Sequence, residues 1–160
     1  MLKTQNLSVA YGKQTIIPNL TVSIPKGKIT ALIGPNGCGK STLLKTLVRI
    51  NNPMSGEVLF EGKPLSSYGD KALARSLSLL PQILVSPEGI TVRKLVEYGR
   101  SPYVSHWGKL GKDDQTIVEQ AMRDTGVLEY ADKPVESLSG GQRQRAWIAM
   151  VIAQDTDIVM

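Results

Sequence analysis

The sequence predicts an α/β fold in which a mostly parallel sheet is joined to an antiparallel, β-rich N-terminal piece and a helical insert. Three observations lead to this prediction. The first third of the chain is rich in β-branched residues and alternating apolar positions, which are typical of strands. After Ile33 the apolar spacing changes to that of a helix, and further helical segments follow. Two short apolar runs, at 74–82 and 157–160, favour additional strands.

Strands are expected at 2–10, 21–24 and 28–33, separated by turn signals such as Tyr11-Gly12 and the stretch 25–28. A helix is expected from 40 to 50, because the pairs Leu43/Leu47 and Leu44/Val48 lie on one helical face. The stretch 51–57 ends this helix, and 57–65 predicts a short hairpin.

Three more helices are expected in the second half. Thr91 is predicted to cap the first, which ends near Gly99, and Asp113 the second. The third runs from about 141 to 153. Because 160 residues with 41% apolar side chains can bury one core, a single domain over 1–160 is expected, with a helical insert at about 83–140.

The charge, the cysteine content and the length of the apolar runs indicate which ligands and which compartment suit the protein. The chain has 19 basic and 14 acidic residues, a net charge of +5, which suits a polyanion such as a nucleotide phosphate. Arg143 and Arg145 lack an accompanying aromatic stacking platform, so nucleic acid is not expected. The single cysteine, Cys38, excludes an internal disulfide and fits a reducing compartment. The longest apolar run, 146–153, is far too short to span a bilayer, so a soluble protein is expected.

The stretch GPNGCGKST, residues 34–42, fits the phosphate-binding pattern G-x-x-x-x-G-K-[ST]. Its glycines let backbone N–H groups turn inward toward phosphate oxygens, and the helix that follows adds its positive end. Lys40 is expected to reach the β- and γ-phosphates, Ser41 to ligate Mg²⁺ and Thr42 to contact the α-phosphate. The alternative is a glycine-rich turn, but a chance match is expected in only about one chain in a few hundred. The predicted nucleotide-binding residues here are Gly34, Pro35, Asn36, Gly37, Cys38, Gly39, Lys40, Ser41 and Thr42.

A second anion receptor is predicted at LSGGQ, residues 138–142, where a serine hydroxyl and glycine N–H groups open a helix. The purely structural alternative is that Ser139 only caps the helix, and the two roles are compatible. The predicted binding residues of this motif are Ser139, Gly140, Gly141 and Gln142.

With these two motifs the chain resembles the ATP-binding subunits of ABC transporters, which share the P-loop NTPase core. The resemblance implies ATP and Mg²⁺ as cofactors and ATP hydrolysis as the activity. It further implies that Tyr11 stacks on adenine, and that Gln82 binds Mg²⁺ and positions the attacking water, so that Gln82 and Lys40 are the catalytic candidates.

The family resemblance also implies partners. A second ATP-binding subunit would pair head to tail, so that Ser139 and Gly141 act on the nucleotide held by the partner's phosphate loop. An integral membrane permease would hold the pair at the cytoplasmic face of the membrane. Cargo would not touch this subunit.

In this family the strand that begins at DIVM, residues 157–160, ends in an Asp-Glu pair, and a switch histidine follows later. The chain is therefore interpreted as the N-terminal part of a longer subunit. Residues 1–160 alone are expected to be marginally folded and to lack meaningful ATPase activity.

The stretches 88–103 and 106–110 resemble the importers of ferric siderophores and ferric dicitrate, the dicitrate importer most closely. Two alternatives stay open: an ABC ATPase without a permease, acting in translation or DNA repair, and a nucleotide-binding fragment without catalysis. His106 and Trp107 are interpreted as surface-loop residues, because one histidine makes a poor metal site.

Overall fold

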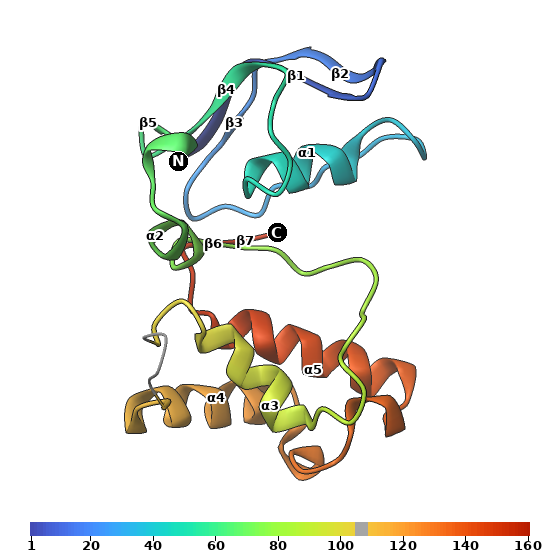
Figure 1. Cartoon of the computed structure of the whole chain (residues 1–160), viewed down its shortest axis with the longest axis vertical. Helices are drawn as coiled ribbons and strands as arrows, with labels where there is room; N and C mark the ends of the chain where they lie inside the picture. Colours follow the sequence, from blue (N-terminus) through green and yellow to red (C-terminus); the bar gives the residue numbers. More distant parts are fainter. Residues whose placement is uncertain (105–108) are drawn as a thin grey trace. The chain divides into compact units, whose positions relative to one another are not determined.

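The computed structural model describes residues 1–104 and 109–160. They form two compact units, Met1–Leu73 and Ala74–Met160 (Figure 1). His106 and Trp107, expected on a surface loop, lie outside the described residues.

The first unit is built on an antiparallel sheet. Strands β1 (Leu2–Tyr11), β2 (Gln14–Leu20), β4 (Ser55–Phe60) and β5 (Lys63–Pro64) are arranged in the order β2-β1-β4-β5, and β3 (Ser23–Ile24) also pairs with β1. The predicted hairpin is confirmed as β4–β5. Strand β2 was not predicted, because its Pro18 is unusual in a strand. Its place at the edge of the sheet tolerates a residue without an N–H.

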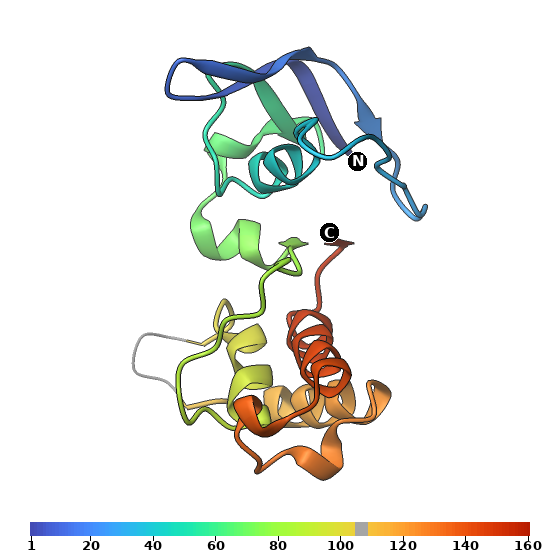
Figure 2. The same ribbon diagram turned by 90° about the vertical axis from the view of Figure 1, so that its right-hand side faces the viewer.

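Helix α1 (Lys40–Leu47) covers one face of this sheet, as Figures 1 and 2 both show. Leu43 and Leu47 are buried on the helix, and Leu7 and Val9 are buried on β1, so the predicted helical face is confirmed. The helix ends earlier than predicted, because Arg49 adopts a left-handed φ of 61° that no helix continues through. The unit is completed by the 3₁₀ turn η1 (Leu65–Ser67) and by α2 (Asp70–Ala74), whose last residue lies just beyond the unit boundary.

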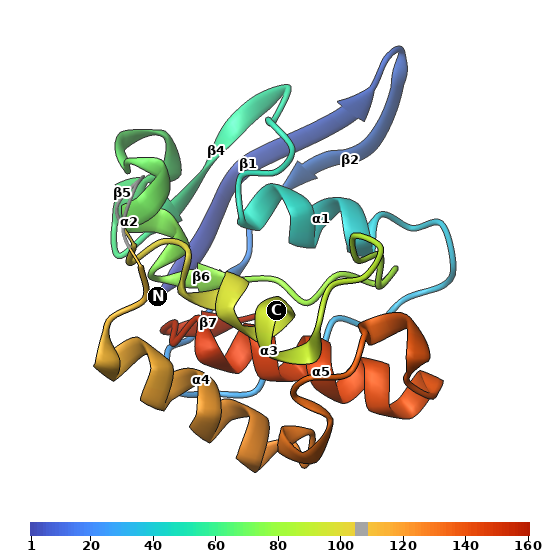
Figure 3. The ribbon, with the colours of Figure 1, turned by 60° about the horizontal axis from the view of Figure 1, so that its bottom comes forward.

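The second unit is mainly helical. The described part contains α3 (Val92–Glu97), α4 (Lys112–Asp124) and α5 (Gly140–Ala153), with 3₁₀ turns η2 (Tyr98–Arg100), η3 (Leu128–Tyr130) and η4 (Val135–Ser137). The three α-helices pack on one another (Figure 3). Their shared core is apolar, with Val92, Val96, Val118, Met122 and Ala146 almost fully buried. Strand β6 (Leu77–Ser78) pairs in parallel with β7 (Ile158–Val159), so the predicted strands at these positions are confirmed.

Two predictions about local structure are wrong. No strand forms at 28–33, because a strand needs hydrogen-bonded neighbours and this segment joins no ladder among the described strands. Its Ile29 and Ile33 are 103% and 90% exposed. Asp113 does not cap α4. The helix begins two residues earlier, at Lys112, and Gly111 is its cap, with the Asp114 carboxylate accepting from the Gly111 N–H.

Parallel pairing is confined to β6 and β7 in the part of the chain that the structure describes, and the larger sheet is antiparallel. In the same residues, no helix combines the length and the apolar character needed to cross a membrane.

Candidate functional site

The phosphate-binding loop, residues 34–39, runs directly into α1 in the first unit. Gly39 occupies the cap position with a φ of 95°, a backbone conformation that residues with a side chain rarely adopt. A Cβ on Gly34 would lie 2.8 Å from the Cys38 sulfur. Glycine is therefore favoured at position 39 by its backbone conformation, whereas a side chain at position 34 would require the Cys38 side chain to shift.

The Lys40 ammonium lies inside the curve of this loop. Its Nζ donates to the carbonyl oxygens of Gly34 and Pro35, at 2.8 and 2.7 Å, and lies 3.8 Å from the Cys38 sulfur. No side chain caps the start of α1, so its first backbone N–H groups have no hydrogen bond to a capping side chain. A cation and free N–H groups at one helix start fit a phosphate group.

A hollow of about 260 Å³ opens beside this loop. Its lining includes Cys38, Gly39, Lys40 and Leu43, together with residues of β2 and of the segment preceding the loop. Ser41 and Thr42 follow in the first turn of α1, with Ser41 exposed. Across the described residues, no group of three or more His, Cys, Asp or Glu could hold a metal ion.

Tyr11 ends strand β1 in the same unit, and its side chain is 52% exposed. Its phenol oxygen accepts a hydrogen bond from Asn51 Nδ2 at 2.7 Å. Sequence reasoning identified Tyr11 and missed Asn51, because no sequence pattern connects residues that far apart in the chain.

Ser139 caps α5 in the second unit. Its Oγ accepts from the Gln142 N–H at 3.3 Å, while Gln142 Oε1 accepts from the Ser139 N–H at 2.9 Å, a reciprocal capping box. The predicted capping role is confirmed. Open space surrounds Gly140 and Gly141 where a Cβ would point, so the helix start is accessible to a ligand.

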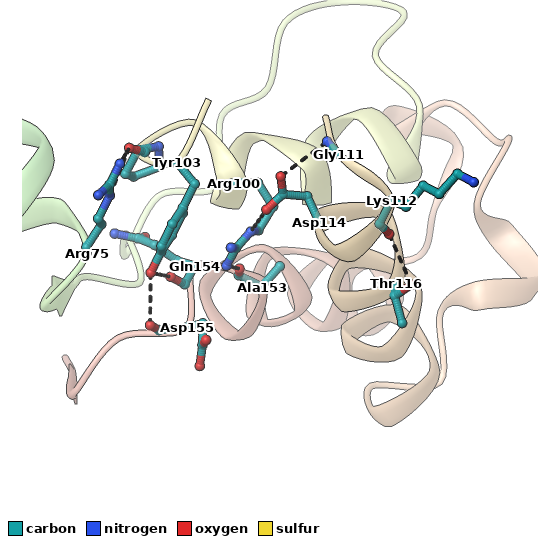
Figure 4. Close-up of polar contacts among 11 residues, drawn as sticks. Arg75, Arg100, Tyr103, Gly111, Lys112, Asp114, Thr116, Ala153, Gln154 and Asp155 are labelled. Carbon is teal, nitrogen blue, oxygen red and sulfur yellow. Dashed lines mark hydrogen bonds and ion pairs between the residues drawn. The ribbon is translucent and has the colours of Figure 1, made fainter. Parts of the chain in front are cut away.

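The opposite end of α5 is held by two side chains that sequence reasoning did not single out (Figure 4). Arg100 is 4% exposed. Its Nε donates to Asp114 Oδ1 at 2.8 Å and its Nη1 donates to the Ala153 carbonyl oxygen at 2.9 Å. The guanidinium also lies over the Tyr103 ring, 3.7 Å from its centroid.

The Tyr103 hydroxyl completes this end by donating to the carbonyl oxygens of Gln154 and Asp155, at 3.0 and 3.2 Å. The last carbonyls of a helix lack internal partners, so these contacts supply donors where the backbone has none. The only sequence signal was the stretch 88–103, which contains both residues.

The predicted site residues are thus divided between the units. Tyr11 and residues 34–42 belong to the first unit, while Gln82 and residues 139–142 belong to the second. Gln82 is exposed, in the segment that follows β6.

A family model described as ABC transporter matches residues 17–160. The chain belongs to the ABC transporter family. This ABC chain is 49% identical over 159 residues to the iron(3+)-hydroxamate import ATP-binding protein FhuC of Bacillus subtilis. It is also 49% identical over 159 residues to the ferric enterobactin transport ATP-binding protein FepC of Escherichia coli. Each match covers 99% of this chain and 59% of the relative, so the chain spans about three-fifths of the curated relatives' length.

Solved structures agree with the family. The structure of an inward-facing conformation of a putative metal-chelate type ABC transporter matches with a TM-score of 0.79 and 33% identity. The match covers 96% of this chain and 56% of that one. The α/β fold class and the family resemblance are therefore confirmed.

Proposed function

We propose that this chain is the ATP-binding part of an ATPase subunit that drives import of a ferric chelate through a membrane permease. The observation that carries the proposal is the 49% identity, over nearly the whole chain, to ATP-binding proteins of ferric hydroxamate and ferric enterobactin uptake. The phosphate-binding loop supports it, because the Lys40 ammonium lies within the loop, bonded to two of its carbonyl oxygens.

The first unit would hold the nucleotide. Lys40 would exchange its two carbonyl partners for β- and γ-phosphate oxygens, while the N–H groups at the start of α1 bind the remaining oxygens. Tyr11 would stack on adenine with its exposed ring. Ser41 and Gln82 would hold Mg²⁺, which supplies neutralisation of phosphate charge when bound. Gln82 would also orient the attacking water.

A second ATP-binding subunit would bring its phosphate loop to the start of α5. The capping box fixes the Ser139 backbone and hydroxyl, and the open space at Gly140 and Gly141 leaves room for a phosphate from that partner. Residues 1–160 would act as one ABC-type domain with a helical insert at about 83–140, on the cytoplasmic face of the membrane beside the permease.

The test is uptake of radiolabelled iron by cells that carry the complete gene with Lys40→Ala. We expect uptake of one ferric chelate to be lost, because the variant removes the cation that binds the γ-phosphate. Lys45→Ala, on the exposed side of the same helix, is the matched control and should keep uptake. Comparing ferric citrate, a ferric hydroxamate and a ferric catecholate identifies the cargo. Unchanged uptake of all three in Lys40→Ala cells would refute the proposal.

A further inference from the structure

Tyr11 and Asn51 are joined by a hydrogen bond between side chains from two different elements of the first unit. The Asn51 amide donates to the Tyr11 phenol oxygen at 2.7 Å, and 40 residues separate the two along the chain. The contact engages only the outer tip of the tyrosine, and the side chain stays 52% exposed. A ring that is held at its hydroxyl is restricted in rotation, and its exposed half remains available for stacking.

Asn51 itself is firmly attached to helix α1. Its N–H donates to the Lys45 carbonyl oxygen at 3.2 Å, a carbonyl that also accepts from Ile50 at 2.8 Å. Arg49, two residues earlier, is held in its left-handed conformation by donating to the carbonyl oxygens of Leu65 and Tyr68, at 2.8 and 2.6 Å. The turn that follows α1 therefore has little freedom, and Asn51 is a fixed donor.

Tyr11 is oriented toward this turn by the strand that carries it. Leu7 and Val9 precede it at alternate positions of β1, and both are buried. Alternate strand residues share a face. Tyr11 also pairs with Gln14 across a two-residue turn, so the end of the strand is fixed as well.

We infer that Asn51 is a positioning residue for the nucleotide base. The same helix α1 has the phosphate-binding loop at its start and, just after its end, the turn that holds Tyr11. The helix thereby sets the place of the base-stacking ring relative to the phosphate cradle. This inference rests on the proposed ATP binding and on the stacking role of Tyr11.

The inference predicts a loss that depends on the base. Asn51→Ala should weaken ATP binding roughly three- to tenfold, the effect of losing one ordinary hydrogen bond. Binding of inorganic tripolyphosphate, which has no base, should not change. Tyr11→Phe, which keeps the ring and removes the hydroxyl, should show the same ATP-specific loss. The double variant should be no worse than either single variant, because both remove one contact.

Isothermal titration of the complete gene product with ATP and with tripolyphosphate measures these effects. Asn51→Asp is the conservative variant and should restore most of the ATP affinity, because its carboxylate accepts the phenol proton. Asn52→Ala is the matched control, since Asn52 is an adjacent exposed asparagine, and should bind as the parent does. Thermal unfolding checks that each variant is folded.

Three results would overturn the inference. Equal weakening of ATP and tripolyphosphate by Asn51→Ala would assign Asn51 to general support of α1. Additive losses in the double variant would show that the two residues act separately. If Asn51→Ala binds ATP normally while Tyr11→Ala binds ATP more weakly, Asn51 has no positioning role, and the proposed function is unaffected. Failure of the parent protein to bind either ligand would instead refute the proposed function itself.

Discussion

At the scale of single residues, the phosphate-binding loop concentrates its chemistry in Lys40 and Cys38. The lysine ammonium is bound by two loop carbonyls, and the cysteine sulfur lies 3.8 Å from it. Cys38 is exposed, and it is the only cysteine in the sequence. Within residues 1–160, a reagent that attacks thiols therefore reports on this loop.

Alkylation of Cys38 should block ATP binding, because the added group would occupy space beside Lys40 where a phosphate must fit. Saturating ATP should in turn slow alkylation. Mass spectrometry of the labelled peptide, with and without ATP, measures the protection, and Cys38→Ser is the control that should bind ATP and take no label. Identical labelling rates in both conditions would count against the placement of the nucleotide in this loop.

At the scale of elements, α5 is a helix with both ends satisfied by side chains. Ser139 and Gln142 cap its start, while Arg100 and Tyr103 supply donors to the carbonyls at its end. A cation near a helix C-terminus also offsets the negative end of the helix dipole. These contacts fix the length and the position of the element that carries the LSGGQ motif.

Replacing Arg100 with methionine should lower the free energy of unfolding by about 3–5 kcal/mol, because it leaves a partly buried carboxylate, Asp114, without its partner. Arg123→Met is the matched control. Arg123 pairs with Glu119 on the surface of α4 at 2.6 Å, and its loss should cost about 1 kcal/mol or less. Urea titration of the complete gene product measures both. Similar losses in the two variants would show that Arg100 has no special role at the end of α5.

At the scale of the whole molecule, the predicted binding residues are shared between two units of the chain. The proposed pairing of two subunits gives the LSGGQ motif a ligand that its own chain's loop need not supply. Because the phosphate-binding loop and the LSGGQ motif belong to different units, nucleotide binding and subunit pairing can be tested with separate variants.

Ser139→Ala should leave the ATP affinity of a single subunit unchanged but weaken ATP-driven pairing, since the variant removes a hydroxyl only from the partner-facing motif. Loss of the cap should also destabilise α5 by about 1 kcal/mol. Ser137→Ala, which removes a nearby exposed hydroxyl bonded to Pro134, is the control. Light scattering after size exclusion, with and without ATP, measures pairing. Unimpaired pairing of the Ser139 variant would contradict the proposed role.

Local signals in the sequence were sufficient where the determining contacts are close along the chain. The i,i+4 pair Leu43/Leu47 identified the buried face of α1, and Ser139 followed by two glycines identified the start of α5. The spacing of apolar residues did not predict strands correctly where strand formation depends on pairing with distant segments. Residues 28–33 have the apolar composition of a strand but join no ladder, whereas β2, with its proline, forms at a sheet edge.

The sequence by itself determined the nucleotide motifs, because backbone curvature, a lysine and a helix start depend on residues that follow one another directly. It also determined the family. Only the tertiary structure decided that Asn51 holds Tyr11 and that Arg100 binds the end of α5. Those contacts join residues 40 and 53 positions apart, and such distances along the chain are closed by packing of whole elements rather than by any local preference.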